Sequence, residues 1–369
     1  MADDPQQKTD LLWPWVAVSA LSRAAFGAAM AWRGVPAAAG CDLPFASAND
    51  VVLELAGLRL RAFGDRAARA TPTLVVAPFA LHDATIADFA PGHSLVAALR
   101  AGGTACVHLV EWRSATAEMR YFDIDSYLAE LNVVVDELGG RVNLAGLCQG
   151  GWLSLVYAAR FPAKIARLAL AGAPVDLEAA ESSLTLSVRN APRGVYESLV
   201  SMGGGRAMGG AMLRFWSGAA QLDAMGHEAL QLDAPDAALA ARFRDWYDRT
   251  IDLPGAYYLQ AVDWLFRRNR LAKGDFPALG RTVDLACVDM PVYILAGDAD
   301  QTCVLPQVLA TRDLVGSADV TIDVAPSDHL GLFMGRHSVA ERWPRIGAWL
   351  AGKPVRRRKP PAKKPRTMS

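Results

Sequence analysis

The chain has 369 residues, which is long enough for one large domain with an insertion or for two modest domains. Apolar residues make up 52% of it and charged residues 21%, a balance typical of a globular enzyme with a sizeable core. The formal net charge is zero, which argues against a protein that wraps nucleic acid, and we expect no specific nucleic-acid partner.

A long apolar segment, residues 11–39, precedes the first predicted strand. It is long enough to cross a bilayer, but Pro14 and Arg23 interrupt it and alanines dominate its second half. The aspartates before it (Asp3, Asp4 and Asp10) are unlike the basic start of a secretory signal. We therefore expect residues 1–49 to form an N-terminal apolar helical segment that packs on the surface, with no transmembrane span, in a cytoplasmic protein.

Strands and helices are predicted to alternate over most of the remaining chain. The expected strands are Val51–Leu60, Leu74–Ala77, Ala105–Val110, Val142–Ala145, Ile165–Ala171, Val292–Ala296 and Val320–Ala325. The expected helices are Ser94–Ala101, Ile124–Leu138, Trp152–Phe161, Pro306–Leu314 and Val339–Leu350. Because parallel strands need crossover connections, this alternation predicts an α/β protein with a mostly parallel sheet and helices on both faces.

The alternation stops between residues 175 and 283, where the sequence favours helices and contains no convincing strand. We interpret residues 179–285 as a helical cap, inserted between two parts of an α/β core at 50–178 and 286–352. An aromatic cluster in the cap has near-helical spacing and is expected to form the cap core, or in part to line an apolar substrate channel: Trp246, Tyr247, Tyr257, Tyr258, Trp264 and Phe266.

The C-terminal tail and the cysteines each exclude a class of structure. Residues 353–369 carry eight Lys or Arg and no acid, and we expect them to be disordered, serving solubility or binding a polyanion or a granule surface.

The chain has five cysteines, which are Cys41, Cys106, Cys148, Cys287 and Cys303. Their number is odd and their spacing is not that of metal ligands. We therefore expect neither a disulfide framework nor a metal site.

Residues 141–152 read RVNLAGLCQGGW and carry the strongest motif. Gly146-Leu147-Cys148-Gln149-Gly150 has the pattern of a nucleophile elbow, in which a residue between a strand and a helix projects from the edge of the sheet. The N-terminus of the following helix favours negative charge on a thiolate there. We therefore predict that Cys148 is a catalytic nucleophile rather than a small buried core residue.

Two later loops supply the expected partners of this cysteine. In PVYILAGDADQTCVLP a strand ends before Asp298 and Asp300, and in TIDVAPSDHLGLF the last strand ends before His329. Nucleophile, acid and histidine in this chain order are typical of the α/β-hydrolase fold. We predict that His329 accepts the thiol proton and that Asp300, at the loop tip, orients the imidazole.

The oxyanion formed during acyl transfer needs backbone donors. We expect the amide of Gln149, at the start of the elbow helix, and the amide of Phe79 or Ala80, in the loop LVVAPFALHDAT after the first core strand. His82 lies in the same loop and is either a substrate contact or a hydrogen-bonded bystander.

Several stretches resemble polyhydroxyalkanoate synthases and intracellular polyhydroxyalkanoate depolymerases. GLCQGGW resembles the synthase box Gly-x-Cys-x-Gly-Gly, whereas depolymerases tend to have proline where this chain has Gly150. RFRDWYDRTIDLPGAYYLQAVDWLFRRNRLAKG, HLGLFMGRHSVAERWP and LVVAPFALHDAT are similar to depolymerase segments, and the resemblance covers residues 73–350. It implies an α/β-hydrolase fold with Cys148, Asp300 and His329 as the triad, Gln149 as an oxyanion donor, and no cofactor.

The resemblance implies two opposite reactions at one thiol. Our first hypothesis is a hydrolase of intracellular poly(3-hydroxyalkanoate) or its oligomers, acting through a thioester acyl-enzyme. The alternative is a synthase that polymerises 3-hydroxyacyl groups from coenzyme A thioesters, and weaker ones are a small-acyl thioesterase and a non-catalytic granule-binding protein. The expected partners are a polyester or hydroxyacyl substrate and the granule surface, and a homodimer is left open.

Overall fold

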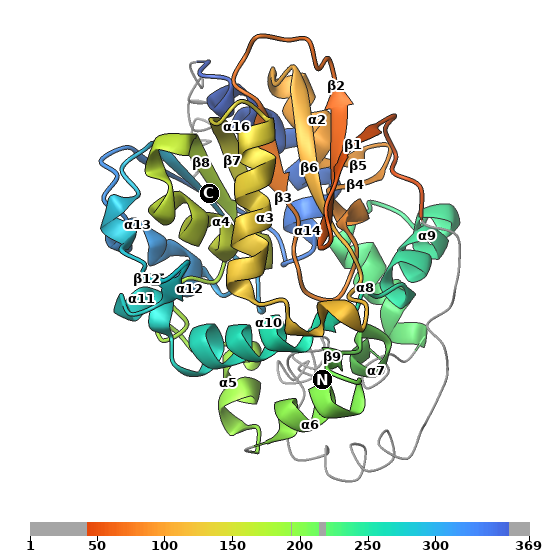
Figure 1. Cartoon of the computed structure of the whole chain (residues 1–369). Coiled ribbons are helices and arrows are strands. Elements are labelled where there is room, and N and C mark those ends of the chain that lie inside the picture. The colour runs from red at the N-terminus through yellow and green to blue at the C-terminus, as the bar shows by residue number, and fades with distance from the viewer. Residues whose placement is uncertain (1–42, 193, 214–218, 354–369) are drawn as a thin grey trace, which may run out of the picture.

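The computed structural model of the chain describes residues 43–192, 194–213 and 219–353 (Figure 1). Most of the expected N-terminal helical segment and nearly all of the basic tail lie outside these residues. An eight-stranded sheet forms the centre, in the order β1-β2-β6-β3-β7-β8-β13-β14. Its strands are β1 (Asp50–Glu54), β2 (Leu58–Gly64), β6 (Cys106–Trp112), β3 (Thr73–Val76), β7 (Val142–Leu147), β8 (Ile165–Ala171), β13 (Val292–Gly297) and β14 (Val320–Ala325).

The single first strand expected at Val51–Leu60 is wrong, because the chain reverses within it. β1 and β2 form an antiparallel hairpin with Asp50 opposite Ala62. The turn is held by the backbone N–H of Gly57, which donates to both carboxylate oxygens of Glu130 at 2.9 and 3.1 Å. A Cβ at Gly57 would lie 2.7 Å from that carboxylate, so a larger residue there would displace the Glu130 side chain. β2 also pairs antiparallel with β6, and the strands from β6 to β14 are parallel to one another.

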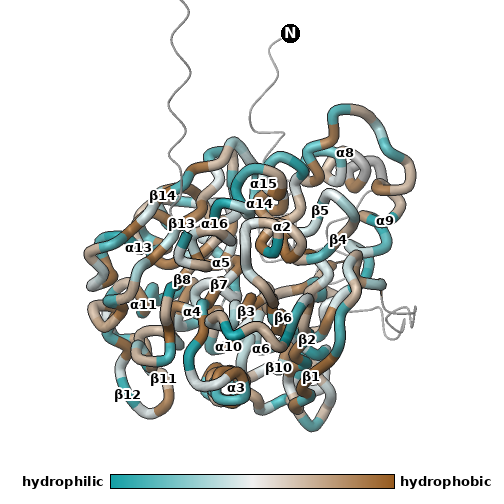
Figure 2. Tube along the Cα trace, turned by 90° about the horizontal axis from the view of Figure 1, so that it is seen from above, coloured by the Kyte–Doolittle hydropathy of each residue, from teal (hydrophilic) through white to brown (hydrophobic). Residues whose placement is uncertain are grey.

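Helices cover both faces of the sheet (Figures 1 and 2). α3 (Ile124–Glu137) and α4 (Gln149–Arg160) lie on one face, and α2 (Leu95–Gly102) and α16 (Trp343–Leu350) on the other. α2 and α16 approach closely, since a Cβ at Gly347 would lie only 2.4 Å from the carbonyl oxygen of Leu99. The mostly parallel sheet with helices on both faces is thus confirmed.

Two expected helices are each divided in the structure. Residues 306–314 form α12 (Leu305–Leu309) and α13 (Thr311–Leu314), and residues 339–350 belong to α15 (Arg336–Glu341) and α16. α4 begins at Gln149, three residues before the expected start, because the helix grows directly out of the elbow. One further short helix, α14 (Gly331–Met334), follows His329.

Between β8 and β13 the chain forms the helices of the cap, in the interval where the sequence predicts them (Figure 1). They are α5 (Ser183–Asn190), α6 (Val195–Met202), α7 (Gly209–Leu213), α8 (Ala219–Ala229), α9 (Ala237–Asp248), α10 (Gly255–Gln260), a π-helical turn (Ala261–Arg267) and α11 (Arg270–Lys273). Four two-residue strands that the sequence does not reveal also occur here, since such bridges are too short for a period-two pattern: β9 (Arg206–Ala207), β10 (Leu253–Pro254), β11 (Pro277–Ala278) and β12 (Arg281–Thr282).

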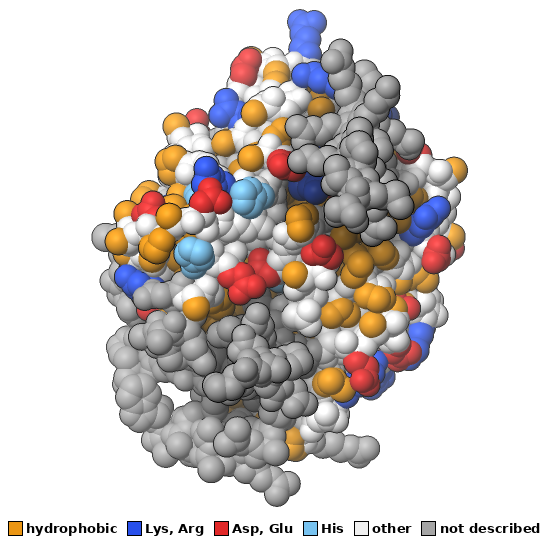
Figure 3. Space-filling model, turned by 180° about the vertical axis from the view of Figure 1, so that it is seen from behind, with side chains coloured by type: hydrophobic (Ala, Val, Ile, Leu, Met, Phe, Trp, Pro, Cys, Tyr) orange, Lys and Arg blue, Asp and Glu red, His pale blue; other side chains and the backbone are white. Residues whose placement is uncertain are grey.

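Several short strands and 3₁₀ turns lie between the main elements. They are β4 (Asp88–Ala90), β5 (His93–Ser94) and the 3₁₀ turns at Ala84–Ala87, Glu118–Tyr121, Pro162–Lys164 and Leu285–Cys287. On the face opposite to that of Figure 1, acidic and basic side chains are interspersed with apolar ones (Figure 3). Among the described helices, none is both long and apolar enough to pass through a membrane.

Candidate active site

The elbow forms as the motif predicts. Cys148 stands between β7 and α4 with φ 48° and ψ −114°, a conformation that non-glycine residues rarely adopt. Its amide donates to the carbonyl of Ala171 on the neighbouring strand at 2.9 Å. The flanking glycines make the turn sterically feasible, because a Cβ at Gly146 would lie 2.6 Å from the Cα of Gly151, and one at Gly150 would lie 2.3 Å from the carbonyl oxygen of Val76. The backbone thus holds Cys148 at the tip of the turn.

Asp300 and His329 meet beside this turn, although their loops follow different strands. Nδ1 of His329 lies 2.6 Å from Oδ2 of Asp300, and both side chains are buried. The other carboxylate oxygen of Asp300 accepts the backbone amides of Thr302 and Cys303, each at 2.8 Å. The carboxylate is therefore fixed by its own loop and orients the imidazole, leaving Nε2 for other partners.

The structure brings a second thiol to the same place. The sulfurs of Cys148 and Cys303 and a ring nitrogen of His329 all lie within 4.8 Å of one another, and the three residues are buried. In the sequence, Cys303 is only one of five scattered cysteines. Its position three residues after Asp300, in the loop that orients the histidine, is the signal that could have revealed it.

These groups alter one another's ionisation. A hydrogen bond from the Cys303 thiol lowers the pKa of Cys148 to about 6; the charge and hydrogen bond of His329 add to this, while burial opposes it. Burial also opposes a charge on His329, but Asp300 and the Cys148 sulfur outweigh it and raise the pKa of the imidazole well above its ordinary value. Burial and the adjacent Cys148 sulfur raise the pKa of Cys303. The favoured state at neutral pH is a Cys148 thiolate beside a His329 imidazolium, with Cys303 protonated.

The predicted oxyanion donors lie at the base of the elbow. Gln149 is the first residue of α4, so its backbone amide has no acceptor within the helix. Its side-chain oxygen accepts the indole N–H of Trp152 at 2.5 Å. The loop with Phe79 and Ala80 leaves β3 directly beside the elbow, because the carbonyls of Val76 and Ala77 face the missing Cβ of Gly150. Both loop residues are buried.

The cap contributes Tyr257, which the sequence analysis assigned only to the aromatic cluster. Its ring on α10 lies 4.8 Å from that of Phe79 and 6.4 Å from that of Trp152. Its hydroxyl is buried and accepts or donates no hydrogen bond within the described residues. Burial and the charge of Cys148 raise the pKa of Tyr257, so the phenol stays protonated as a donor near the thiol. Nothing in the sequence distinguishes it from Tyr258.

His82 lies elsewhere, against the cap. Its ring centroid is 4.4 Å from that of Trp246 and 5.0 Å from that of Tyr247, and Nδ1 lies 3.2 Å from the carbonyl oxygen of Arg249. Burial lowers the pKa of His82 to about 4, so the ring is neutral at neutral pH. His82 therefore packs the loop after β3 against α9. A contact between His82 and substrate stays a prediction.

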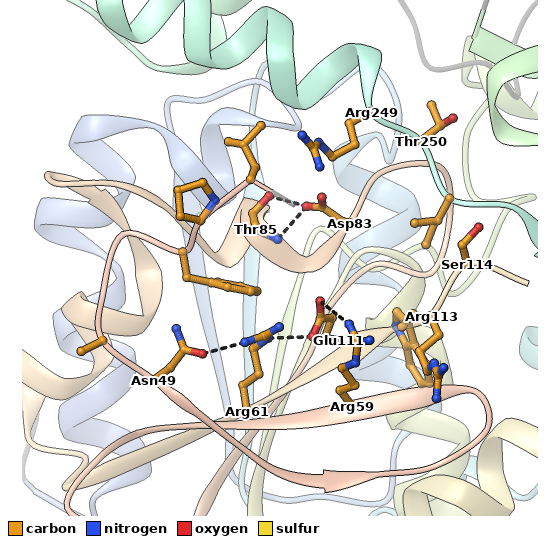
Figure 4. A pocket seen from close by; sticks show the side chains of 16 residues that line it. Asn49, Arg59, Arg61, Asp83, Thr85, Glu111, Arg113, Ser114, Arg249 and Thr250 are labelled. Atoms are coloured by element: carbon orange, nitrogen blue, oxygen red, sulfur yellow. Dashed lines mark hydrogen bonds and ion pairs between the residues drawn. The ribbon is translucent and has the colours of Figure 1, made fainter. Parts of the chain in front are cut away.

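A cavity of about 730 Å³ lies apart from the cysteine, between the β1–β2 hairpin and the chain that follows α9 (Figure 4). Its polar lining includes Arg59, Arg61 and Glu111, and the Arg61 guanidinium lies 2.6 Å from the Glu111 carboxylate. Trp112 lines the cavity and stacks on Phe79 at 5.1 Å, so one aromatic layer separates it from the predicted oxyanion loop.

The sheet order, the elbow and the convergence of Asp300 and His329 define a class: this is an α/β-hydrolase-fold protein with cysteine at the elbow. Solved structures with this fold include a membrane phospholipase A (TM-score 0.54, 16% identity, 83% of this chain and 86% of that chain). Another is a monoacylglycerol lipase from Paleococcus ferrophilus (TM-score 0.54, 16% identity, 80% of this chain and 98% of that chain). At these identities the likeness shows the fold alone.

Sequence comparisons show which family the chain resembles. The family model described as PHB de-polymerase C-terminus matches residues 174–353. Poly(3-hydroxyalkanoate) polymerase subunit PhaC of Haloferax mediterranei is 24% identical over 82% of this chain, and that of Synechocystis sp. is 28% identical over 72% of it. The aligned regions span 63% and 73% of those two relatives. These matches confirm the resemblance to polyhydroxyalkanoate synthases and depolymerases that the motifs show.

Proposed function

We propose that this chain is an acyltransferase of the polyhydroxyalkanoate synthase type, which moves 3-hydroxyacyl groups from coenzyme A thioesters to a growing polyester. The relatives described above are named polymerase subunits, and this favours the synthase alternative over the depolymerase hypothesis that we placed first from the sequence. The observation that carries the proposal is the buried array of Cys148, His329 and Asp300 at the elbow of this fold.

In the proposed first half-reaction, the Cys148 thiolate attacks the carbonyl carbon of the acyl thioester. The carbon–sulfur bond to coenzyme A breaks, and the imidazolium of His329 gives its Nε2 proton to the departing thiolate. In the second half-reaction, the hydroxyl of a polyester chain end gives its proton to His329 and attacks the acyl-enzyme. The new ester forms and the Cys148 thiolate returns, while Asp300 stabilises the imidazolium whenever it is charged.

Each half-reaction passes through a tetrahedral intermediate with a negatively charged oxygen. We assign its stabilisation to the amide of Gln149 and to the amide of Phe79 or Ala80, the donors that flank the elbow. The hydroxyl of Tyr257 is a third donor in this proposal, supplied by the cap. A buried phenol without a partner in the free protein is suited to this role, since it has no existing hydrogen bond to give up.

The burial of the site supports transfer to a hydroxyl rather than to water. Cys148 is 3% exposed and His329 4% exposed, so little water reaches the thioester intermediate in the described conformation. Transfer of the acyl group from a thioester to an alcohol is energetically downhill, whereas transfer from an ordinary serine ester would be close to thermoneutral. The site uses coenzyme A as part of its substrate and needs no other cofactor.

We place the protein in the cytoplasm at the surface of polyester granules, because its proposed product is insoluble. The polyester chain is then both product and partner. A homodimer, which the sequence leaves open, is not required by the chemistry above.

The deciding experiment compares two substrates. Purified protein with 3-hydroxybutyryl-CoA should release free coenzyme A and form polymer, and the Cys148→Ala variant should do neither. Amorphous polyester granules should yield few soluble hydroxy acids with either protein. Rapid release of hydroxy acids from granules, without polymer from the thioester, would return the assignment to the depolymerase hypothesis.

A further inference from the structure

Three soft or borderline metal ligands converge at the elbow. The sulfurs of Cys148 and Cys303 and a ring nitrogen of His329 lie within 4.8 Å of one another, on loops that follow three different strands. Two cysteines and one histidine form a donor set that zinc accepts in proteins, with the fourth tetrahedral position left for a water or a substrate atom.

The spacing of these atoms is close to what a tetrahedral zinc ion requires. Zn–S distances of about 2.3 Å and Zn–N distances of about 2.0–2.1 Å place neighbouring ligands about 3.5–3.8 Å apart. The side chains would therefore move by on the order of an ångström or less to bind one ion.

The surrounding hydrogen bonds also fit a metal ligand. Nδ1 of His329 is held by Asp300 at 2.6 Å, which leaves Nε2 as the nitrogen available to a metal. Metal-bound histidines commonly have such a carboxylate behind them, because it fixes the ring and increases the basicity of the other nitrogen. The same carboxylate binds the amide of Cys303 at 2.8 Å, so it positions two of the three ligands.

We propose that Cys148, Cys303 and His329 form a binding site for a thiophilic divalent cation such as Zn²⁺, and that the bound ion blocks the elbow thiol. Metal binding is independent of the reaction that the protein catalyses. The blocking effect rests on the proposed acyltransferase function, because the ion holds both the nucleophile and the proton carrier.

Direct binding measurements test the site without an activity assay. Chelator-treated full-length protein is titrated with Zn²⁺ against a chromophoric chelator, and in parallel with Co²⁺ by absorption spectroscopy. We expect one tight Zn²⁺ per chain, visible bands of tetrahedral Co²⁺, and a sulfur-to-cobalt charge-transfer band. X-ray absorption of the zinc complex should show two sulfur ligands and one nitrogen ligand from the protein.

Variants of two buried cysteines then locate the ion. Cys303→Val should weaken Zn²⁺ binding at least tenfold and remove the tetrahedral cobalt spectrum. Cys106→Val is the matched control, because Cys106 is also buried and its sulfur lies 3.8 Å from Nε2 of His108, but among the described residues it belongs to no group of three metal ligands. Circular dichroism establishes that both variants fold, and Cys303→Ala replaces Cys303→Val if the larger side chain prevents folding.

The outcomes separate the two proposals. Octahedral cobalt spectra, or Zn²⁺ binding that is lost with Cys106→Val and kept with Cys303→Val, would overturn the metal site whatever the activity. Tight binding at the trio supports the site even if the protein proves to be a hydrolase. Where acyl transfer is measurable, micromolar Zn²⁺ should abolish it and a chelator should restore it.

Discussion

The sulfurs of Cys148 and Cys303 lie within 4.8 Å of each other, and the two residues follow different strands of the sheet. The Cys303 loop also carries Asp300, which binds both the Cys303 amide and the ring of His329. One loop therefore controls the ionisation of the elbow thiol in two ways, through the imidazolium and through a neutral thiol.

The first prediction concerns the acidity of Cys148. In the native protein its pKa is about 6, so alkylation by iodoacetamide should proceed at nearly its full rate at pH 7 and fall as pH drops through 6. Removing the donor with Cys303→Val should shift this fall to higher pH, because the thiolate loses its first stabilising contact. The measurement is the alkylation rate of Cys148 by mass spectrometry between pH 4 and 9. Exposed Cys287 in the same sample is the internal control, and an unchanged profile in the variant would contradict the assignment.

The second prediction concerns the buried ion pair. Asp300→Asn keeps the shape of the side chain but removes the charge that holds His329 protonated, so the pKa of the histidine should fall. We expect the rate of acyl transfer to drop about 10²–10⁴-fold, since the imidazole loses both its orientation and its stabilising charge. Asp328→Asn is the control, because that carboxylate instead accepts the amide of Gly331 at 2.8 Å. Equal losses in the two variants would argue for a general structural effect.

The third prediction tests the cap tyrosine. Tyr257→Phe removes only a hydroxyl that lacks a partner within the described residues, so the stability of the free protein should not fall. Acyl transfer should nevertheless slow about 10–100-fold if the hydroxyl stabilises the oxyanion. Tyr127→Phe is a matched control, because its hydroxyl is also buried without a partner and its ring lies 5.2 Å from that of Tyr257. A slowdown of the same size in both variants would point to packing.

The fourth prediction concerns the glycine that replaces the depolymerase proline. A Cβ at Gly150 would lie 2.3 Å from the carbonyl oxygen of Val76, so Gly150→Ala should lower the free energy of unfolding by about 1–3 kcal/mol. Urea denaturation measures the effect. Gly210→Ala in α7 is the control, because a Cβ there would meet nothing closer than 3.8 Å. If Gly150→Ala were as stable as the native protein, the close approach of the elbow to β3 would not be what excludes a side chain at this position.

Much of the fold and part of the candidate site could be predicted from the sequence. The parallel strands, the helices between them and the elbow are local patterns, because the alternation of apolar residues and the glycines around Cys148 depend on neighbouring positions. Asp300 and His329 could also be named in advance, since the order of loops along an α/β-hydrolase chain fixes which strand ends meet. The β1–β2 hairpin was missed because an apolar run hides a turn that depends on the distant carboxylate of Glu130.

Only the tertiary structure decides which side chains surround Cys148. Tyr257 carries no local signal that sets it apart from Tyr258, and Cys303 is marked only by its position three residues after Asp300. Both reach the elbow from segments that are distant in sequence, a loop and a cap helix. Hydrogen bonds and charge interactions act over a few ångströms of space, whatever the separation along the chain. The residue types that can perform acyl transfer are thus visible in the sequence, while the acidity of the thiol and the proposed metal site depend on contacts that exist only once the chain has folded.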